Sequence, residues 1–179
     1  MAIETYYPAR LFKAPRRFKY IIIHDTSCQW ENTNIFSIDK RMFQSSPMRA
    51  RFRSMKQYYE SPYHFICEKI GESYQTVMGK PLQYSSFVEF PDIDRRYAQN
   101  AIHVCLMGNY NIMSHSAKLY EQLSYRILCP MMRVYRIPRS RIYLHGELSK
   151  KHSDCPGFNF SKQTLLAFMM KYVMGVQGG

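Results

Sequence analysis

The sequence predicts a single α/β domain with a central mixed β-sheet flanked by helices. Apolar runs of strand length alternate along the chain with segments that repeat apolar residues at helical spacing. The length of 179 residues suits one well-buried domain and is short for two. Since no internal repeat or low-complexity linker interrupts the chain, we expect one domain over residues 1–179, with a core from about 18 to 174 between short end segments.

The first part of the chain is predicted to alternate between strands and helices. The expected strands cover residues 18–24, 62–67 and 73–77, and the expected helices cover 35–44 and 48–59. The first strand contains three consecutive isoleucines, which is typical of a strand buried on both faces. Gly71 and Glu72 can turn the chain between the second and third strands, which predicts a hairpin.

The second part of the chain is predicted to end with a long helix, a strand and a closing helix. Strands are expected over residues 101–107 and 141–144, and helices over 116–135 and 161–173. Ser116 and Ser161 are the expected caps of the two helices, and Pro130 is expected to kink or split the longer one. Residues 79–100 contain few periodic apolar positions, so we expect a loop with at most a short strand, of a length typical of loops that line a groove.

Charge and cysteine content limit the possible function classes. Lysine and arginine exceed aspartate and glutamate by 25 − 13 = 12, and a basic surface attracts polyanions such as nucleic acids, anionic membranes or bacterial wall polymers. No recognised nucleic-acid motif accompanies the charge, so specific nucleic-acid binding ranks low. Five cysteines without a CxxC pair argue against a zinc ribbon or a thioredoxin-like site.

The chain shows no targeting or membrane segment by sequence. Its N-terminus lacks the basic start and apolar core of a signal peptide. No apolar run approaches the about 20 residues that cross a bilayer. We therefore expect a protein made in the cytoplasm, with no membrane span.

Two histidines and one cysteine form the candidate site. His24 ends the first predicted strand, His145 directly follows the strand over 141–144, and Cys155 lies in an Asp-Cys-Pro-Gly turn. Two imidazoles and one thiolate suit zinc, and a three-ligand set leaves the fourth position open for water. Each histidine taken alone is more often a core residue than a ligand, so spacing leaves both interpretations open.

Five blocks of the chain resemble, in order, the type 2 N-acetylmuramoyl-L-alanine amidases. This family belongs to one superfamily with peptidoglycan recognition proteins and phage amidase lysozymes. The matching blocks are residues 20–26, residues 63–66 with 74–75, residues 100–110, residues 122–123 with 135–138, and His145 with residues 154–157. The similarity runs from about Phe18 to Phe160 and implies the fold of these amidases and recognition proteins.

The resemblance also implies roles for individual residues. It implies that His24, His145 and Cys155 bind one zinc ion. It implies further that Tyr63 positions the zinc-bound water or hydrogen-bonds the developing oxyanion. Some relatives carry aspartate before the Pro-Gly pair, where this chain has Cys155. Asp154 is therefore expected either to support the site from behind the ligands or to be a solvated turn residue.

The residues just before the cysteine depart from the family pattern. Many bacterial and phage members carry a lysine two residues before the third ligand, where this chain has Ser153. The hydroxyl of Ser153 is the expected substitute in catalysis, and His152 is a further candidate supporting group. A missing cation would cost a few kcal/mol of transition-state stabilisation if no other group supplies it.

The resemblance implies a zinc-dependent hydrolase that cleaves the amide between N-acetylmuramic acid and L-alanine of the peptidoglycan stem peptide. We expect a phage lysin, made in the host cytoplasm and acting on the wall after release or as part of a virion with other virion proteins as partners. The main alternative is a non-catalytic peptidoglycan-binding module, which Ser153 favours and the intact ligand set disfavours. A virion structural component that keeps the fold is another.

Overall fold

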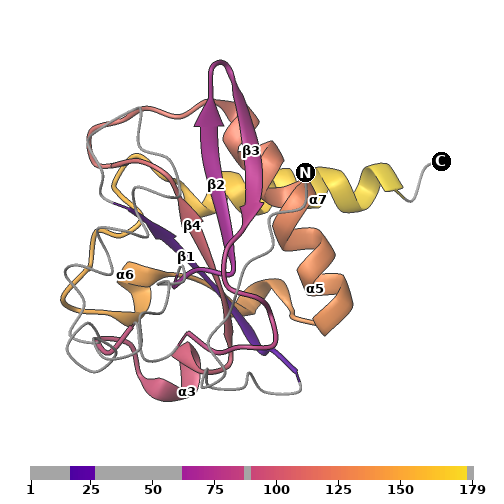
Figure 1. Cartoon of the computed structure of the whole chain (residues 1–179). Helices are drawn as coiled ribbons and strands as arrows, with labels where there is room; N and C mark the ends of the chain where they lie inside the picture. Colours follow the sequence, from indigo (N-terminus) through magenta and orange to yellow (C-terminus); the bar gives the residue numbers. More distant parts are fainter. Residues whose placement is uncertain (1–16, 27–61, 87–89, 177–179) are drawn as a thin grey trace, which may run out of the picture.

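A five-stranded mixed sheet forms the centre of the molecule (Figure 1). The computed structural model describes residues 17–26, 62–86 and 90–176. The strands are β1 (Tyr20–Asp25), β2 (Phe65–Ile70), β3 (Ser73–Met78), β4 (Ala101–Leu106) and β5 (Ile142–Leu144), in the order β3-β2-β4-β1-β5. Strands β2, β4, β1 and β5 are parallel, and β3 is antiparallel to β2. The predicted α/β class with a mixed sheet is confirmed.

The two faces of the sheet are covered by different segments. Side chains that alternate along a strand point to opposite faces, and Ile21 and Ile23 pack in one apolar cluster while Ile22 packs in another. The first cluster joins the sheet to α4 (Ala117–Gln122), the π-helical turn η2 (Leu123–Leu128), α5 (Cys129–Tyr135) and α7 (Lys162–Val176). The second cluster contains Phe90, Ile93 and Ala98, and His24 shares the face of Ile22.

The predicted long helix is present but divided. It runs through α4, η2 and α5, and Pro130 lies in the first turn of α5, where its missing N–H is tolerated. Ser116 stands at the predicted N-cap position of α4, but its side chain makes no cap hydrogen bond. Ser161 does cap α7, because its Oγ accepts from the backbone N–H of Thr164 at 3.1 Å.

Several predicted boundaries differ from the structure. The hairpin of β2 and β3 is confirmed, but β2 begins at Phe65, so Tyr63 and His64 lie just before it. The predicted loop over 79–100 contains the short helix α3 (Arg95–Ala98), whose N-cap is Asp94. A second short helix, α6 (His145–Leu148), starts where a loop was expected. The helices predicted over 35–44 and 48–59 lie outside the described residues.

The helices carry no membrane signature. Among the residues that the structure describes, no helix is both long and apolar enough to span a bilayer. α7, at 15 residues, is shorter than a membrane-spanning helix needs to be.

Candidate active site

The two histidines meet because they follow neighbouring parallel strands. Ile23 of β1 is paired with Leu144 of β5. The residues that follow them, His24 and His145, therefore lie at the same edge of the sheet. His24 is still within β1, and His145 is the first residue of α6. Both side chains are buried, with residue exposures of 1% and 6%, so their contacts are made inside the protein.

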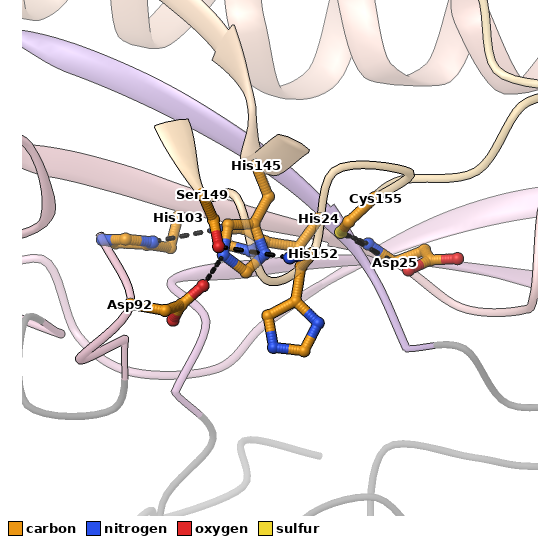
Figure 2. Close-up of polar contacts among 8 residues, drawn as sticks. All are labelled: His24, Asp25, Asp92, His103, His145, Ser149, His152 and Cys155. Carbon is orange, nitrogen blue, oxygen red and sulfur yellow. Dashed lines mark hydrogen bonds and ion pairs between the residues drawn. The ribbon is translucent and has the colours of Figure 1, made fainter. Parts of the chain in front are cut away.

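The loop after α6 brings the cysteine to the same place. The backbone N–H of Gly146 donates to the Cys155 carbonyl at 2.9 Å, which ties the loop to α6. The Cys155 Sγ accepts from the backbone N–H of Asp25 at 3.4 Å and lies 3.5 Å from its carboxylate Oδ1. As a result, one candidate ligand atom each from His24, His145 and Cys155 lies within 4.8 Å of the others (Figure 2).

A carboxylate orients His145 from behind. His145 Nε2 lies 2.7 Å from Oδ2 of Asp92, and Figure 2 shows this contact beside Ser149, whose hydroxyl also bonds Asp92. Because a carboxylate only accepts hydrogen bonds, Nε2 carries the proton and Nδ1 keeps its lone pair for a metal. Such carboxylate–histidine pairs fix the tautomer and ring orientation of metal-binding histidines.

Burial sets the charge states of the candidate ligands. It lowers the pKa of His24, and the neighbouring histidines lower it further, so His24 is neutral at neutral pH. Burial also lowers the pKa of His145, although the Asp92 carboxylate opposes part of that shift. For Cys155, burial and then the negative charge of Asp25 raise the pKa, so the group is a thiol in the absence of a metal.

Two nitrogen atoms and one sulfur suit zinc. Zinc–nitrogen and zinc–sulfur bonds of about 2.0–2.3 Å place tetrahedral ligands about 3.3–3.8 Å apart. The candidate ligand atoms lie within 4.8 Å of one another, which is close to that range. Neutral imidazoles are ready to coordinate, and the thiol needs only to lose its proton. The donor set therefore fits one zinc ion with a fourth position for water.

Tyr63 lies against the candidate ligands. Its ring centroid is 5.4 Å from that of His24 and 5.6 Å from that of Phe90, and the residue is 5% exposed. Burial raises its pKa well above the ordinary value, and the thiols of Cys105 and Cys155 add to the shift. Tyr63 is therefore a neutral phenol, which is the form that can donate a hydrogen bond to a developing negative charge.

The other predicted site residues lie at the surface of the cysteine loop. The ring of His152 is 5.3 Å from the ring of His145, at the exposed side of the site. Asp154 accepts a hydrogen bond from Asn111 Nδ2 at 2.7 Å and so holds the loop rather than facing the ligands. Ser153 is exposed, and no hydrogen bond within the described part of the chain fixes its hydroxyl.

Three side chains next to the ligands, of which Asp25 and His103 are buried and Asp92 is partly buried, were not among the residues predicted from the sequence. Asp25 contacts Cys155, Asp92 contacts His145, and His103 contacts His24 with 2.9 Å between Nε2 of His24 and Nδ1 of His103. A histidine inside the apolar strand over 101–107 was a readable signal for His103. No sequence feature pointed to Asp92, because the local sequence of a long loop does not predict which part of the fold the loop contacts.

Comparison with known families identifies the chain. The family model described as N-acetylmuramoyl-L-alanine amidase matches residues 14–158, which is most of the chain. The chain belongs to this family. The resemblance expected from the five sequence blocks is therefore confirmed, and amidase or peptidoglycan-binding activity is the function that the family supports. None of the curated proteins compared matches the chain.

Solved structures of amidases and recognition proteins share the fold. N-acetylmuramoyl-L-alanine amidase LysC from Clostridium intestinale superposes with a TM-score of 0.62 at 18% identity, covering 91% of this chain and 93% of that one. Drosophila peptidoglycan recognition protein SA gives 0.56 at 14% identity, covering 86% and 80%. The recognition protein LCa–LCx complex with tracheal cytotoxin gives 0.61 at 18%, covering 88% and 87%.

Proposed function

We propose that this amidase-family protein is a zinc-dependent peptidoglycan hydrolase that cleaves the amide joining N-acetylmuramic acid to L-alanine of the stem peptide. The observation that carries the proposal is the convergence of His24, His145 and Cys155 within 4.8 Å. A catalytic zinc site has three protein ligands and one open position. A protein that only binds peptidoglycan has no need of such a set.

The mechanism follows from the roles that these side chains can fill. A zinc ion bound in this site would supply a water of lowered pKa, near about 7, and a positive charge beside the amide carbonyl. His24, His145 and Cys155 would hold the ion, and Asp92 keeps His145 in the tautomer that leaves Nδ1 free for it. We assign Tyr63 as the donor that stabilises the oxyanion of the tetrahedral intermediate, with the exposed hydroxyl of Ser153 as a second donor. Asp154 holds the cysteine loop through its hydrogen bond with Asn111, and His152 lies at the exposed side of the site beside His145.

Replacing Tyr63 by phenylalanine is expected to slow turnover without removing the metal. The substitution keeps the ring that packs on His24 and Phe90 and deletes only the hydroxyl. Loss of one oxyanion donor costs about 100-fold in kcat. Turnover on peptidoglycan and bound zinc should be measured on the same preparation, and an unchanged kcat would remove Tyr63 from the catalytic assignment.

Zinc affinity is expected to rise with pH between pH 6.5 and 8. Both histidines have pKa values below the ordinary value, so they are mostly neutral in this range and add little pH dependence. The pKa of Cys155 is raised, so its thiol must release one proton for each zinc bound. Affinity should therefore increase about tenfold per pH unit. Competition with a chelator at several pH values tests this, and a flat profile would show that the thiolate is not a ligand.

The bond that is cleaved can be identified directly. Purified protein should release new L-alanine amino termini from purified peptidoglycan without new reducing sugars. Release of reducing sugars instead would assign a glycosidase. Cleavage elsewhere in the peptide would expose a different amino-terminal residue. Either result would contradict the proposed bond specificity.

A non-catalytic binding module is the second candidate function. One observation favours it: the position of the lysine found in many relatives is held by Ser153, which is exposed and not fixed by a described hydrogen bond. Tight retention on peptidoglycan without release of amino termini would support this candidate. The formal net charge of +12 would contribute to retention on an anionic wall in either case, and added salt should weaken it.

We also propose that the protein serves as a phage lysin. A neighbour that supports this is the endolysin amidase LysCS from Clostridium intestinale, with a TM-score of 0.60 at 18% identity over 91% of each chain. In this role the protein is made in the host cytoplasm and reaches the wall after release or on a virion, with virion proteins as further partners. Lysis of host cells from within when the protein is co-expressed with a membrane-permeabilising protein tests this role.

A further inference from the structure

His103 is buried behind the candidate metal site and contacts His24. His103 lies in β4, all six residues of which are buried, and its own exposure is 0%. It is paired with Ile22 across the β1–β4 ladder, on the face of the sheet that also carries His24. His24 Nε2 and His103 Nδ1 are 2.9 Å apart, which is a hydrogen bond between two imidazoles (Figure 2).

The direction of this hydrogen bond follows from the other nitrogen of His103. His103 Nε2 is 3.0 Å from the backbone carbonyl oxygen of Ala98, and a carbonyl oxygen only accepts. The proton of a neutral His103 must therefore be on Nε2, since the opposite tautomer would place two lone pairs against each other. Its Nδ1 is then an acceptor, and His24 must donate from Nε2.

The environment keeps His103 neutral and its ring fixed. His103 is fully buried, and its ring nitrogens contact an imidazole and a carbonyl oxygen, so no negative charge offsets the cost of a buried imidazolium. Its backbone N–H donates to His64 Nδ1 at 3.0 Å, and His64 Nε2 lies 2.9 Å from the Tyr84 carbonyl oxygen, so this second histidine also has a determined tautomer. The Phe90 ring stacks on both His24 and His103 with centroid distances of 4.4 Å.

We propose that His103 is a positioning residue that fixes His24 as the Nε2–H tautomer and so leaves His24 Nδ1 free to bind the metal. The series of hydrogen bonds runs from the Ala98 carbonyl oxygen through the ring of His103 to the ring of His24, whose Nδ1 is the candidate ligand atom. His24 is thereby oriented by an imidazole, whereas His145 is oriented by the Asp92 carboxylate. The link to zinc rests on the proposed function, but the tautomer of His24 is a property of the metal-free protein.

The tautomer can be measured without metal or substrate. In metal-free protein labelled with ¹⁵N-histidine, long-range ¹H–¹⁵N spectra distinguish a protonated from an unprotonated ring nitrogen. We expect His24 to show a protonated Nε2 and an unprotonated Nδ1, and His103 to show the same pattern. A protonated Nδ1 on His24 would overturn the proposal, whether or not the protein is an amidase.

Substitution tests the consequence for the metal. His103→Leu removes the acceptor and is expected to weaken zinc binding about 10–100-fold, as loss of such supporting groups does. His103→Asn is expected to recover most of the affinity, because its side-chain oxygen can take the place of Nδ1. Ile102→Ala is the control: it alters a buried residue of the same strand on the opposite face and should leave zinc affinity unchanged.

The outcomes separate positioning from general stability. Weak zinc binding in His103→Leu with recovery in His103→Asn supports the proposal. Equal losses in His103→Leu and Ile102→Ala, or no loss in His103→Leu, would overturn it. If His103→Leu does not fold, the spectrum of the unsubstituted protein still decides. Absence of amidase activity alone would count against the proposed function and not against the tautomer.

Discussion

Cys155→Ala is expected to abolish zinc binding and amide cleavage together. Zinc held by a small protein site is bound with about 10–16 kcal/mol, so loss of one of three ligands should remove about 4 kcal/mol, or about a thousandfold in affinity. Because the candidate ligands converge on one point, the remaining histidines would hold the ion only weakly. Bound zinc should be measured by elemental analysis after dialysis, beside the rate of L-alanine amino-terminus release.

Cys129→Ala is the matched control for this change. Cys129 is a free, half-buried thiol on α5, which packs in the cluster on the other face of the sheet. This variant should keep one zinc ion per chain and full activity. Stoichiometric zinc in Cys155→Ala would show that the ligand assignment is wrong, and loss of zinc in Cys129→Ala would show that the assay reports instability.

Gly146→Ala is expected to damage the site through geometry alone. A Cβ at Gly146 would overlap the carbonyl oxygen of Ser153 and come within 3.0 Å of the carbonyl oxygen of Cys155. These are backbone atoms of the cysteine loop, so a change of side-chain rotamer cannot relieve the overlap. Forcing them away should cost about 1–3 kcal/mol of folding free energy. The resulting displacement of Cys155 from His145 should reduce activity about 100-fold, as misplacements near 1 Å do.

A glycine far from the site provides the comparison. Gly71 turns the β2–β3 hairpin with φ +56°, and a Cβ there would meet no atom within 4 Å. Gly71→Ala should cost about 1 kcal/mol through backbone strain and leave zinc content unchanged. Thermal unfolding and zinc content should be compared for both variants. Equal zinc content in the two would mean that the contact between Gly146 and the loop does not position Cys155.

The strands could be predicted from the sequence because their signals are local. Three consecutive isoleucines before His24, and the apolar run over 101–107, favour central strands because they are short and rich in β-branched residues, and both are central strands. The short helices α3 and α6 escaped prediction because four residues carry too little periodicity to separate them from a loop. The N-cap position of Ser116 could be predicted, but the absence of its side-chain hydrogen bond could not, because that bond depends on the side-chain rotamer.

The candidate ligands could be predicted from the sequence because each lies at the end of a strand or beside a turn motif. His24 and His145 stand at strand ends, and Cys155 stands before a Pro-Gly pair. Their orienting partners were not readable, because those contacts join distant segments: Asp92 and His145 are 53 positions apart, and His24 and His103 are 79 apart. Of the two roles open for Asp154, the structure shows the solvated turn residue, which accepts from Asn111, and Asp25 is the carboxylate beside Cys155.

Titration of metal-free protein with zinc tests most directly whether His24, His145 and Cys155 form a catalytic zinc site. Release of L-alanine amino termini from purified peptidoglycan should be followed as zinc is added, with bound metal measured in parallel. Activity should rise in proportion to bound zinc and stop rising at one ion per chain. Full activity before zinc is added, or none with one ion bound, would contradict the account.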